Sequence, residues 1–231
     1  MSTGPVNASP VIAGPVSPGP VIAPPLDVRR AGSQALLVTF GTLAEAAAFR
    51  AGLVAAPVPG VTELVSGART LLVRFDPGRT DPTRLAPRLQ AVEPVRPTRA
   101  DVDEVTTIPV TYDGEDLATV AALVGTTAEQ LVAWHTGQTW TSAFCGFAPG
   151  FSYLIGTAPA LDLPRRSTAR TSVPAGSVAL AGEFSAVYPR VSPGGWQLIG
   201  RTDVSMWSLD RDPPALAPAG TRIRFVDAGR A

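Results

Sequence analysis

The sequence predicts an α+β fold in two parts, and three observations support this prediction. From Leu26 to about Glu93, strand and helix patterns alternate along the chain. After Trp140 the pattern changes to short apolar runs separated by glycine and proline, which is typical of a small β-barrel or sandwich. The 231 residues are 45% hydrophobic, which is enough to bury one large core or two small ones.

A proline-rich segment precedes these parts. Residues 1–26 contain seven prolines and no charged residue. We expect a disordered, low-complexity tail there, because such a composition cannot bury a core. The predicted domains are therefore the tail over 1–26, an α+β domain over 27–98 and a β-rich domain over 99–231.

The elements of the first domain follow an order typical of a ferredoxin-like layer. A strand pattern is followed by an alanine-rich helix that a capping box of Thr42 and Glu45 introduces. Two β-rich runs joined by a Ser-Gly turn predict a hairpin, and Asp81 with Pro82 predicts the start of a second helix. The order β-α-β-β-α matches a small ferredoxin-like layer. The expected strands are 35–40, 61–65 and 70–75, and the expected helices are about 42–56 and 81–92.

The second domain follows a polar connector over 94–104 and begins with a strand and two helices. A capping box of Thr126 and Glu129 predicts the start of the second helix, which ends at Gly137. The segment Ser-Pro-Gly-Gly from Ser192 predicts a turn. The expected strand and helices are 106–111, 115–124 and 126–136, and the later apolar runs are 144–151, 173–180, 187–189, 196–200, 204–209 and 222–226.

Composition excludes several kinds of chemistry. All 19 basic residues are arginine, so the chain has no Schiff-base lysine, no biotin-carrying lysine and no P-loop lysine. One histidine and one cysteine cannot form a His/Cys zinc site or an internal disulfide, and we expect a reducing cytoplasm as the compartment. A formal net charge of zero gives no reason to expect nucleic acid or a membrane surface as partner.

Three clusters in the β-rich half could carry chemistry. Residues 146–154 combine glycine, proline and three aromatic residues, which predicts a shaped loop beside a site or a tight turn with core aromatics. Residues 163–202 hold five arginines against one acid, an excess that would attract a carboxylate or phosphate unless it is a solvated face. Gln197 and Arg201 lie on one side of a strand by period two and could bind an amide or carboxylate.

The single histidine and the single cysteine have separate interpretations. His135 falls on the apolar face of its helix, in the last turn, so a structural role competes with a catalytic one. It is the only side chain in the sequence with an unperturbed pKa near neutrality. We expect Cys145 to be a small buried hydrophobe.

The motifs at these clusters resemble a known family. Gly-Phe-Ala-Pro-Gly-Phe-Ser-Tyr-Leu at 146–154, Val-Pro-Ala-Gly-Ser-Val at 173–178 and Ser-Pro-Gly-Gly-Trp-Gln-Leu-Ile-Gly-Arg-Thr at 192–202 resemble the KipI/PxpB family, also labelled allophanate hydrolase subunit 1. The resemblance covers residues from about 26 to 227. It implies a ferredoxin-like N-terminal domain and a cyclophilin-like C-terminal β-barrel.

The resemblance also implies a function. Members look like one subunit of an ATP-dependent 5-oxoprolinase, which opens 5-oxo-L-proline to L-glutamate together with a KipA/PxpC-type partner and a PxpA-type subunit. The implied cofactor is ATP, shared with the partner subunits, and we expect the chain to be inactive alone. Two alternatives come from other members: an inhibitor of a sensor histidine kinase, and half of the biotin-dependent carboxyltransferase unit of urea carboxylase.

Residue type and motif position then give the candidate site residues. For proton transfer and anion stabilisation they are His135, Arg166 and Arg201, and for substrate contacts they are Phe151, Tyr153, Glu183 and Gln197. The family usually shows Gly-Gly-Gln-Thr-Gly-Ile-Tyr-Pro where this chain has residues 181–189. Glu183 and Phe184 replace small or neutral residues there, which changes the shape and charge expected of the site wall.

Overall fold

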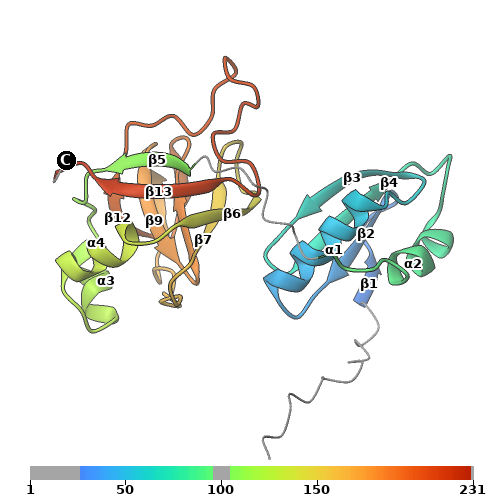
Figure 1. Cartoon of the computed structure of the whole chain (residues 1–231), viewed down its shortest axis with the longest axis horizontal. Coiled ribbons are helices and arrows are strands. Elements are labelled where there is room, and N and C mark those ends of the chain that lie inside the picture. Colours follow the sequence, from blue (N-terminus) through green and yellow to red (C-terminus); the bar gives the residue numbers. More distant parts are fainter. Residues whose placement is uncertain (1–26, 96–104, 230–231) are drawn as a thin grey trace, which may run out of the picture.

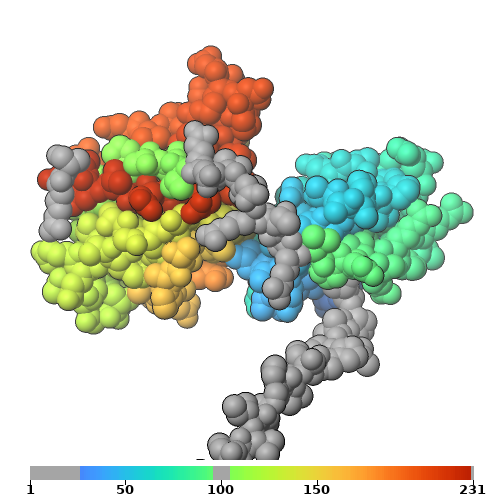
Figure 2. Space-filling model, in the orientation of Figure 1, coloured from blue at the N-terminus to red at the C-terminus, as the bar shows by residue number. Residues whose placement is uncertain are grey.

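A computed structural model describes residues 27–95 and 105–229, which form two larger sheets, each with its own hydrophobic core, and one small two-stranded sheet. A four-stranded sheet with two helices comes first along the chain, and a seven-stranded sheet with two helices follows (Figure 1). In the space-filling view these residues gather in two lobes (Figure 2). The α+β class is therefore confirmed, whereas the tail over 1–26 and most of the connector lie outside the described residues.

The first sheet is antiparallel and has both helices on one face. Its order is β1-β2-β4-β3, and apolar residues of β2, β4, α1 and α2 form a single core. The sequence did not predict β1, an exposed edge strand in which three of four residues are charged. Because β1 precedes β2 along the chain and lies at its side, the ferredoxin-like assignment stays a prediction. The elements are β1 (Asp27–Arg30), β2 (Ala35–Thr39), α1 (Leu43–Ala55), β3 (Val61–Ser66), β4 (Thr70–Phe75) and α2 (Pro82–Gln90).

The capping signals of this layer are confirmed. The Thr42 hydroxyl accepts from the Glu45 amide at 3.2 Å, and the Glu45 carboxylate accepts from the Thr42 amide at 3.3 Å. Asp81 accepts from two amides of the first turn of α2, and Pro82 is the first helical residue. Both helix starts therefore use the side chains that the sequence indicated.

The second sheet curls into a nearly closed barrel. Its order is β12-β9-β10-β7-β6-β13-β5, and only the β13–β5 pair is parallel. Thr111, just after β5, pairs with Arg201 at the end of β12 through two backbone hydrogen bonds of 2.8 and 2.9 Å, which joins the two edges. The strands are β5 (Val105–Val110), β6 (Trp140–Cys145), β7 (Ser152–Gly156), β9 (Ser177–Ala181), β10 (Phe184–Val187), β12 (Gln197–Arg201) and β13 (Arg222–Asp227).

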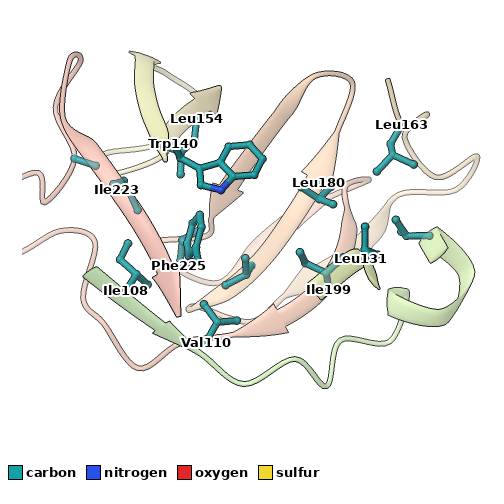
Figure 3. Close-up of a cluster of buried hydrophobic side chains, with 14 of the residues drawn as sticks. Ile108, Val110, Leu131, Trp140, Leu154, Leu163, Leu180, Ile199, Ile223 and Phe225 are labelled. Atoms are coloured by element: carbon teal, nitrogen blue, oxygen red, sulfur yellow. The ribbon is translucent and has the colours of Figure 1, made fainter. Parts of the chain in front are cut away.

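The barrel encloses an apolar core that two helices cover at one end. Figure 3 shows the rings of Trp140 and Phe225 in the middle of this core, with aliphatic side chains such as Ile199 around them. Helix α3 (Leu117–Leu123) contacts β12, and α4 (Ala128–Thr136) contacts β13. Two further strands, β8 (Arg170–Val173) and β11 (Ser192–Gly194), pair with each other and form a separate two-stranded sheet.

Several local predictions in this half are wrong. The capping box of α4 is Thr127 with Gln130, because the Thr126 amide is already bonded to the Ala121 carbonyl in the C-terminal cap of α3. The segment from Ser192 is the strand β11 rather than a turn, because its residues pair with β8. Residues 204–209 form no strand, and Cys145 is exposed because it ends β6 with its side chain outside both cores.

Among the described residues, no single helix is long and apolar enough to cross a membrane. Only α3 and α4 taken together reach that length and composition, and they are bent by 92° relative to each other.

Closure of the barrel predicts that Gly114 cannot be replaced by a residue with a side chain without loss of stability. A Cβ atom at Gly114 would overlap the backbone of Leu198 and Ile199, so Gly114→Ala should lower the free energy of unfolding by roughly 1–3 kcal/mol. At Gly195 the nearest atom to an added Cβ is 3.7 Å away, so Gly195→Ala is the matched control. Urea unfolding of both variants measures the difference, and equal stability of the two would contradict this account of closure.

Candidate functional site

The outer face of the barrel carries a cluster of aromatic rings. Strand alternation directs Leu154 into the barrel and Tyr153 out of it, so the outward rings gather in a second apolar cluster. Tyr153 stacks on Phe144 with centroids 4.3 Å apart and meets the ring of Trp196 at 5.6 Å. The outward cluster consists of Phe144, Phe147, Phe151, Tyr153, Phe184, Tyr188 and Trp196.

The loop before β7 supports this cluster. Phe147 and Gly150 both adopt positive φ, of 66° and 81°, and a Cβ at Gly150 would come within 2.8 Å of the Trp207 Cβ. The loop directs Phe151 into the cluster, where it is 1% exposed, and leaves Phe147 58% exposed. The shaped loop expected from the glycines and proline is therefore present over residues 146–151, and Phe151 packs in it rather than facing open space.

Part of the aromatic cluster lines a small cavity of about 350 Å³. Phe144, Tyr153, Phe184 and Trp196 supply its rings, and Arg165 supplies its charge. We call this cavity the aromatic pocket. Phe184, which departs from the usual family motif, is one of its walls. The remaining lining residues are Ala68, Ala181 and Gly182.

The electrostatics of the aromatic pocket depend on Arg165. Burial raises the pKa of Tyr153, and the positive charge of Arg165 offsets part of that rise. Within the two described stretches no acidic side chain forms an ion pair with Arg165. The pocket therefore combines flat apolar walls, one phenol and one guanidinium, a set suited to a small ring compound that bears an anion.

The other arginines of this region are mostly paired. Arg166 donates to Asp116 at 2.6 Å, and Arg170 donates to Asp116 at 2.9 and 3.0 Å and to Glu115 at 2.9 Å. Arg201 pairs with Asp113 at 2.9 Å on the surface. The arginine excess seen between residues 163 and 202 is therefore offset in space by three acids upstream.

Asp116 is the centre of this ion-pair group. Its side chain is 5% exposed and also accepts a 2.7 Å hydrogen bond from the Leu198 amide. Burial alone would raise the pKa of Asp116, but hydrogen bonds from Arg170 and Leu198 and the charges of Arg170 and Arg166 hold it below its usual value. Asp116 thus stays ionised and ties residues 166–170 to the barrel edge.

Gln197 and Arg201 point to opposite sides of the sheet. A bulge between Leu198 and Gly200 breaks the alternation, so the expectation that they share one side is wrong. Gln197 is buried and donates to the Pro164 carbonyl at 3.1 Å. Its amide therefore holds the backbone beside Arg165 and does not line the pocket.

His135 is completely buried inside the barrel, with both ring nitrogens engaged. Nδ1 lies 2.7 Å from the Tyr112 hydroxyl and Nε2 lies 2.9 Å from the Ser185 hydroxyl. The imidazole stacks on Phe225 with centroids 4.4 Å apart. Burial lowers the pKa of His135 to about 3, so the ring is neutral near pH 7 and this geometry supports the structural alternative.

A larger cleft of about 740 Å³ adjoins the aromatic pocket and contains Glu183. The first turns of α1 and the β3–β4 turn line it on one side, and β6 lines it on the other. Arg50 and Arg69 are its two basic residues. Phe144 lines both spaces, so Tyr153 and Glu183 open onto neighbouring parts of one surface.

The described residues contain no group of three or more His, Cys, Asp or Glu side chains able to hold a metal ion. Sequence reasoning named Tyr153 and Glu183, which border these spaces, but it passed over Arg165 and the acids Asp113, Glu115 and Asp116. The three acids follow one another closely after β5, so their spacing could have indicated a cluster of carboxylates able to pair with the arginines. No local signal distinguishes Arg165 from Arg166.

Comparison with known proteins places these motifs in a family. Residues 26–217 match the family described as carboxyltransferase domain, subdomain C and D. A protein of Escherichia coli O157:H7 named as a 5-oxoprolinase subunit is 46% identical over 122 residues, 52% of this chain and 56% of the relative. The 5-oxoprolinase subunit of the same name from Bacillus subtilis (strain 168) is 33% identical over 221 residues, 86% of this chain and 91% of the relative.

Solved structures share the fold. A crystal structure of the protein TTHA0988 superposes with a TM-score of 0.69 at 36% identity and covers 84% of this chain, but only 40% of that longer chain is matched. Urea carboxylase of Kluyveromyces lactis superposes with a TM-score of 0.68 at 17% identity, over 88% of this chain and 22% of that chain, a likeness of fold alone. The chain thus spans about half of the E. coli relative and less than half of TTHA0988.

The ion pairs of Asp116 predict that replacing Asp116 costs far more unfolding free energy than replacing Asp113. Asp116→Asn leaves Arg166 and Arg170 facing a neutral amide in a buried site and should cost about 3 kcal/mol of unfolding free energy. Asp113→Asn breaks only the exposed pair with Arg201 and should cost about 0–1 kcal/mol. Chemical denaturation distinguishes them, and a small, equal loss for both variants would remove Asp116 from this central role.

Burial of neutral His135 predicts a pH dependence of stability. Between its folded pKa of about 3 and its ordinary value near 6.5, the unfolded chain binds a proton that the folded chain does not. Stability should therefore rise with pH across this window, by up to about 1.4 kcal/mol per pH unit. Unfolding free energies measured from pH 4 to 7 should show this slope in the wild type and a flatter one in His135→Gln. Parallel curves would show that His135 is not buried and neutral.

Proposed function

The chain belongs to the family of the carboxyltransferase domain, subdomain C and D, and we propose on that basis that it is a subunit of an ATP-dependent 5-oxoprolinase. The reaction opens the lactam of 5-oxo-L-proline and gives L-glutamate. The observation that carries this proposal is the pair of relatives that share one name as a 5-oxoprolinase subunit. One of them aligns over nearly its whole length with this chain, and the other reaches 46% identity over a shorter stretch.

The residues of the chain support a role as part of a larger enzyme. The sequence has no lysine to bind nucleotide phosphates in a P-loop, and its one histidine has both ring nitrogens occupied inside the barrel. We therefore infer that the groups for proton transfer and nucleotide binding come at least partly from other chains. We assign these to a KipA/PxpC-type partner and a PxpA-type subunit, with ATP bound by the assembled complex.

The contribution of this chain is substrate binding at the aromatic pocket and the adjoining cleft. Tyr153 and Glu183 offer a phenol and a carboxylate that can hydrogen-bond a cyclic amide. Phe151 packs behind Tyr153, with ring centroids 5.1 Å apart, and supports it without reaching the ligand. Arg166 acts through its ion pair with Asp116, and Arg201 lies on the surface beside Asp113.

A second candidate is half of a biotin-dependent carboxyltransferase, which the name of the family favours. In that case the carrier lysine belongs to another chain, because this sequence has none. Biotin-dependent carboxyl transfer and ATP-dependent ring opening require different partner proteins and different assays, so one set of reconstitutions separates them.

Reconstitution tests the proposed function. The chain mixed with its PxpA-type and KipA/PxpC-type partners, 5-oxo-L-proline and ATP should release L-glutamate, and each component alone should not, because the required groups are divided among the chains. Glutamate is measured by an enzyme-coupled assay. The control omits only this chain, and full activity without it would refute the proposal. Activity that instead needs a biotinylated carrier protein would favour the carboxyltransferase.

A further inference from the structure

Arg165 differs from the arginines on either side of it in the fold. Arg166 and Arg170 both bind Asp116, whereas within residues 27–95 and 105–229 no ion pair neutralises Arg165. Arg165 lines the aromatic pocket together with Tyr153 and Trp196. Its guanidinium is therefore the charge in this pocket that is available to a ligand.

The backbone on both sides of Arg165 is fixed. The Pro164 carbonyl accepts from the buried Gln197 amide at 3.1 Å, and the Arg166 amide donates to the Gly195 carbonyl at 2.7 Å. One residue before Pro164, Leu163 forms a two-hydrogen-bond bridge with Gly182, with distances of 3.0 and 2.6 Å. The Cα of Arg165 is thus held in place before any ligand arrives, which lowers the entropic cost of binding.

The walls of the pocket favour a flat ring. Tyr153 lies parallel to Phe144 within 14°, while Phe184 meets Tyr153 edge to face at 86° and Trp196 meets it at 65°. Ring faces and edges from several directions leave flat apolar surfaces, and the cavity of about 350 Å³ has the size of a site for a small molecule. A guanidinium at the rim of such a space pairs well with a carboxylate.

We propose that Arg165 binds the carboxylate of the substrate, and that the aromatic pocket is the site for a small ring that carries a carboxylate. The identity of the ring as a five-membered lactam rests on the proposed function. Gln197 and Arg166 are positioning residues in this arrangement, because they fix the backbone around Arg165. The Tyr153 hydroxyl is a group of the pocket lining that can form a hydrogen bond with the amide of the ring.

Binding to the full chain tests this assignment without any catalysis. Calorimetric titration with 5-oxo-L-proline should show binding, and Arg165→Gln should weaken it about tenfold or more, as expected for loss of a charge-assisted pair. The ligand 2-pyrrolidinone has the lactam but no carboxylate, so its weaker binding should be the same for wild type and variant. Arg224→Gln is the matched control, since Arg224 is exposed on β13 outside the pocket lining and should bind like wild type.

Three results would overturn the assignment. The first is equal binding of 5-oxo-L-proline by wild type and Arg165→Gln, and the second is no binding by the wild-type full chain at millimolar ligand. The third is inorganic phosphate that binds more tightly than the ring carboxylate and loses this binding in Arg165→Gln.

In the assembled enzyme, Arg165→Gln should raise KM for 5-oxo-L-proline more than it lowers kcat. These outcomes are separate from the test of the proposed function, which asks whether the reconstituted complex releases L-glutamate and whether it needs this chain to do so.

Discussion

The buried carboxylate of Asp116 connects the closure of the barrel with the loop that forms the candidate site. It accepts a hydrogen bond from the Leu198 amide on β12 and binds Arg166 and Arg170 on the other side. A carboxylate that is this deeply buried is stable as an anion only when several donors surround it. The residues after β5, the edge strand β12 and the arginine-rich loop are therefore held together by one charged group.

Within the part of the chain that the structure describes, this arrangement divides the arginines near the aromatic pocket into those bound to an acid and one that is not. Arg166 and Arg170 bind Asp116 and hold the chain in its fold, whereas Asp113 only balances the charge of Arg201 on the surface. Arg165 lies between the anchored residues Pro164 and Arg166, so its backbone is fixed while its side chain keeps an unbalanced charge at the aromatic pocket. The same contacts that stabilise the fold thus position a group for binding.

The barrel interior and its outer face have different chemistry. Inside, His135 uses both ring nitrogens to contact Tyr112 and Ser185 and stacks on Phe225, so the one imidazole of the chain is a neutral part of the core. Outside, the alternate residues of the same strands carry a second cluster of rings, in which Phe151, Tyr188 and Trp196 are buried and Tyr153 and Phe184 are only partly covered. The polar groups of His135 and Ser185 are therefore buried and bonded to each other, whereas Tyr153, Arg165 and Glu183 line the spaces outside the barrel.

The sequence by itself determined those features that depend on a few neighbouring residues. The capping box of Thr42 and Glu45, the helix start at Asp81 and the strands with β-branched runs follow from contacts within one turn or one strand, and the family motifs identified the relatives. It missed the edge strand β1, whose charged residues look like a loop, and placed one capping box a residue too early, because Thr126 serves the preceding helix.

Only the tertiary structure decided which charged side chains are taken up in ion pairs and which are available to a ligand. Arg166 and Arg170 meet Asp116 across 50 and 54 residues of chain, and Arg201 meets Asp113 across 88. The bulge that turns Gln197 away from Arg201, and the contact of His135 with Ser185 across 50 residues, likewise depend on strand pairing. The ion pairing, the burial and the direction of a side chain depend on partners distant in sequence. Arg165 therefore differs from Arg166 and Arg170 only after the fold has brought those two to Asp116.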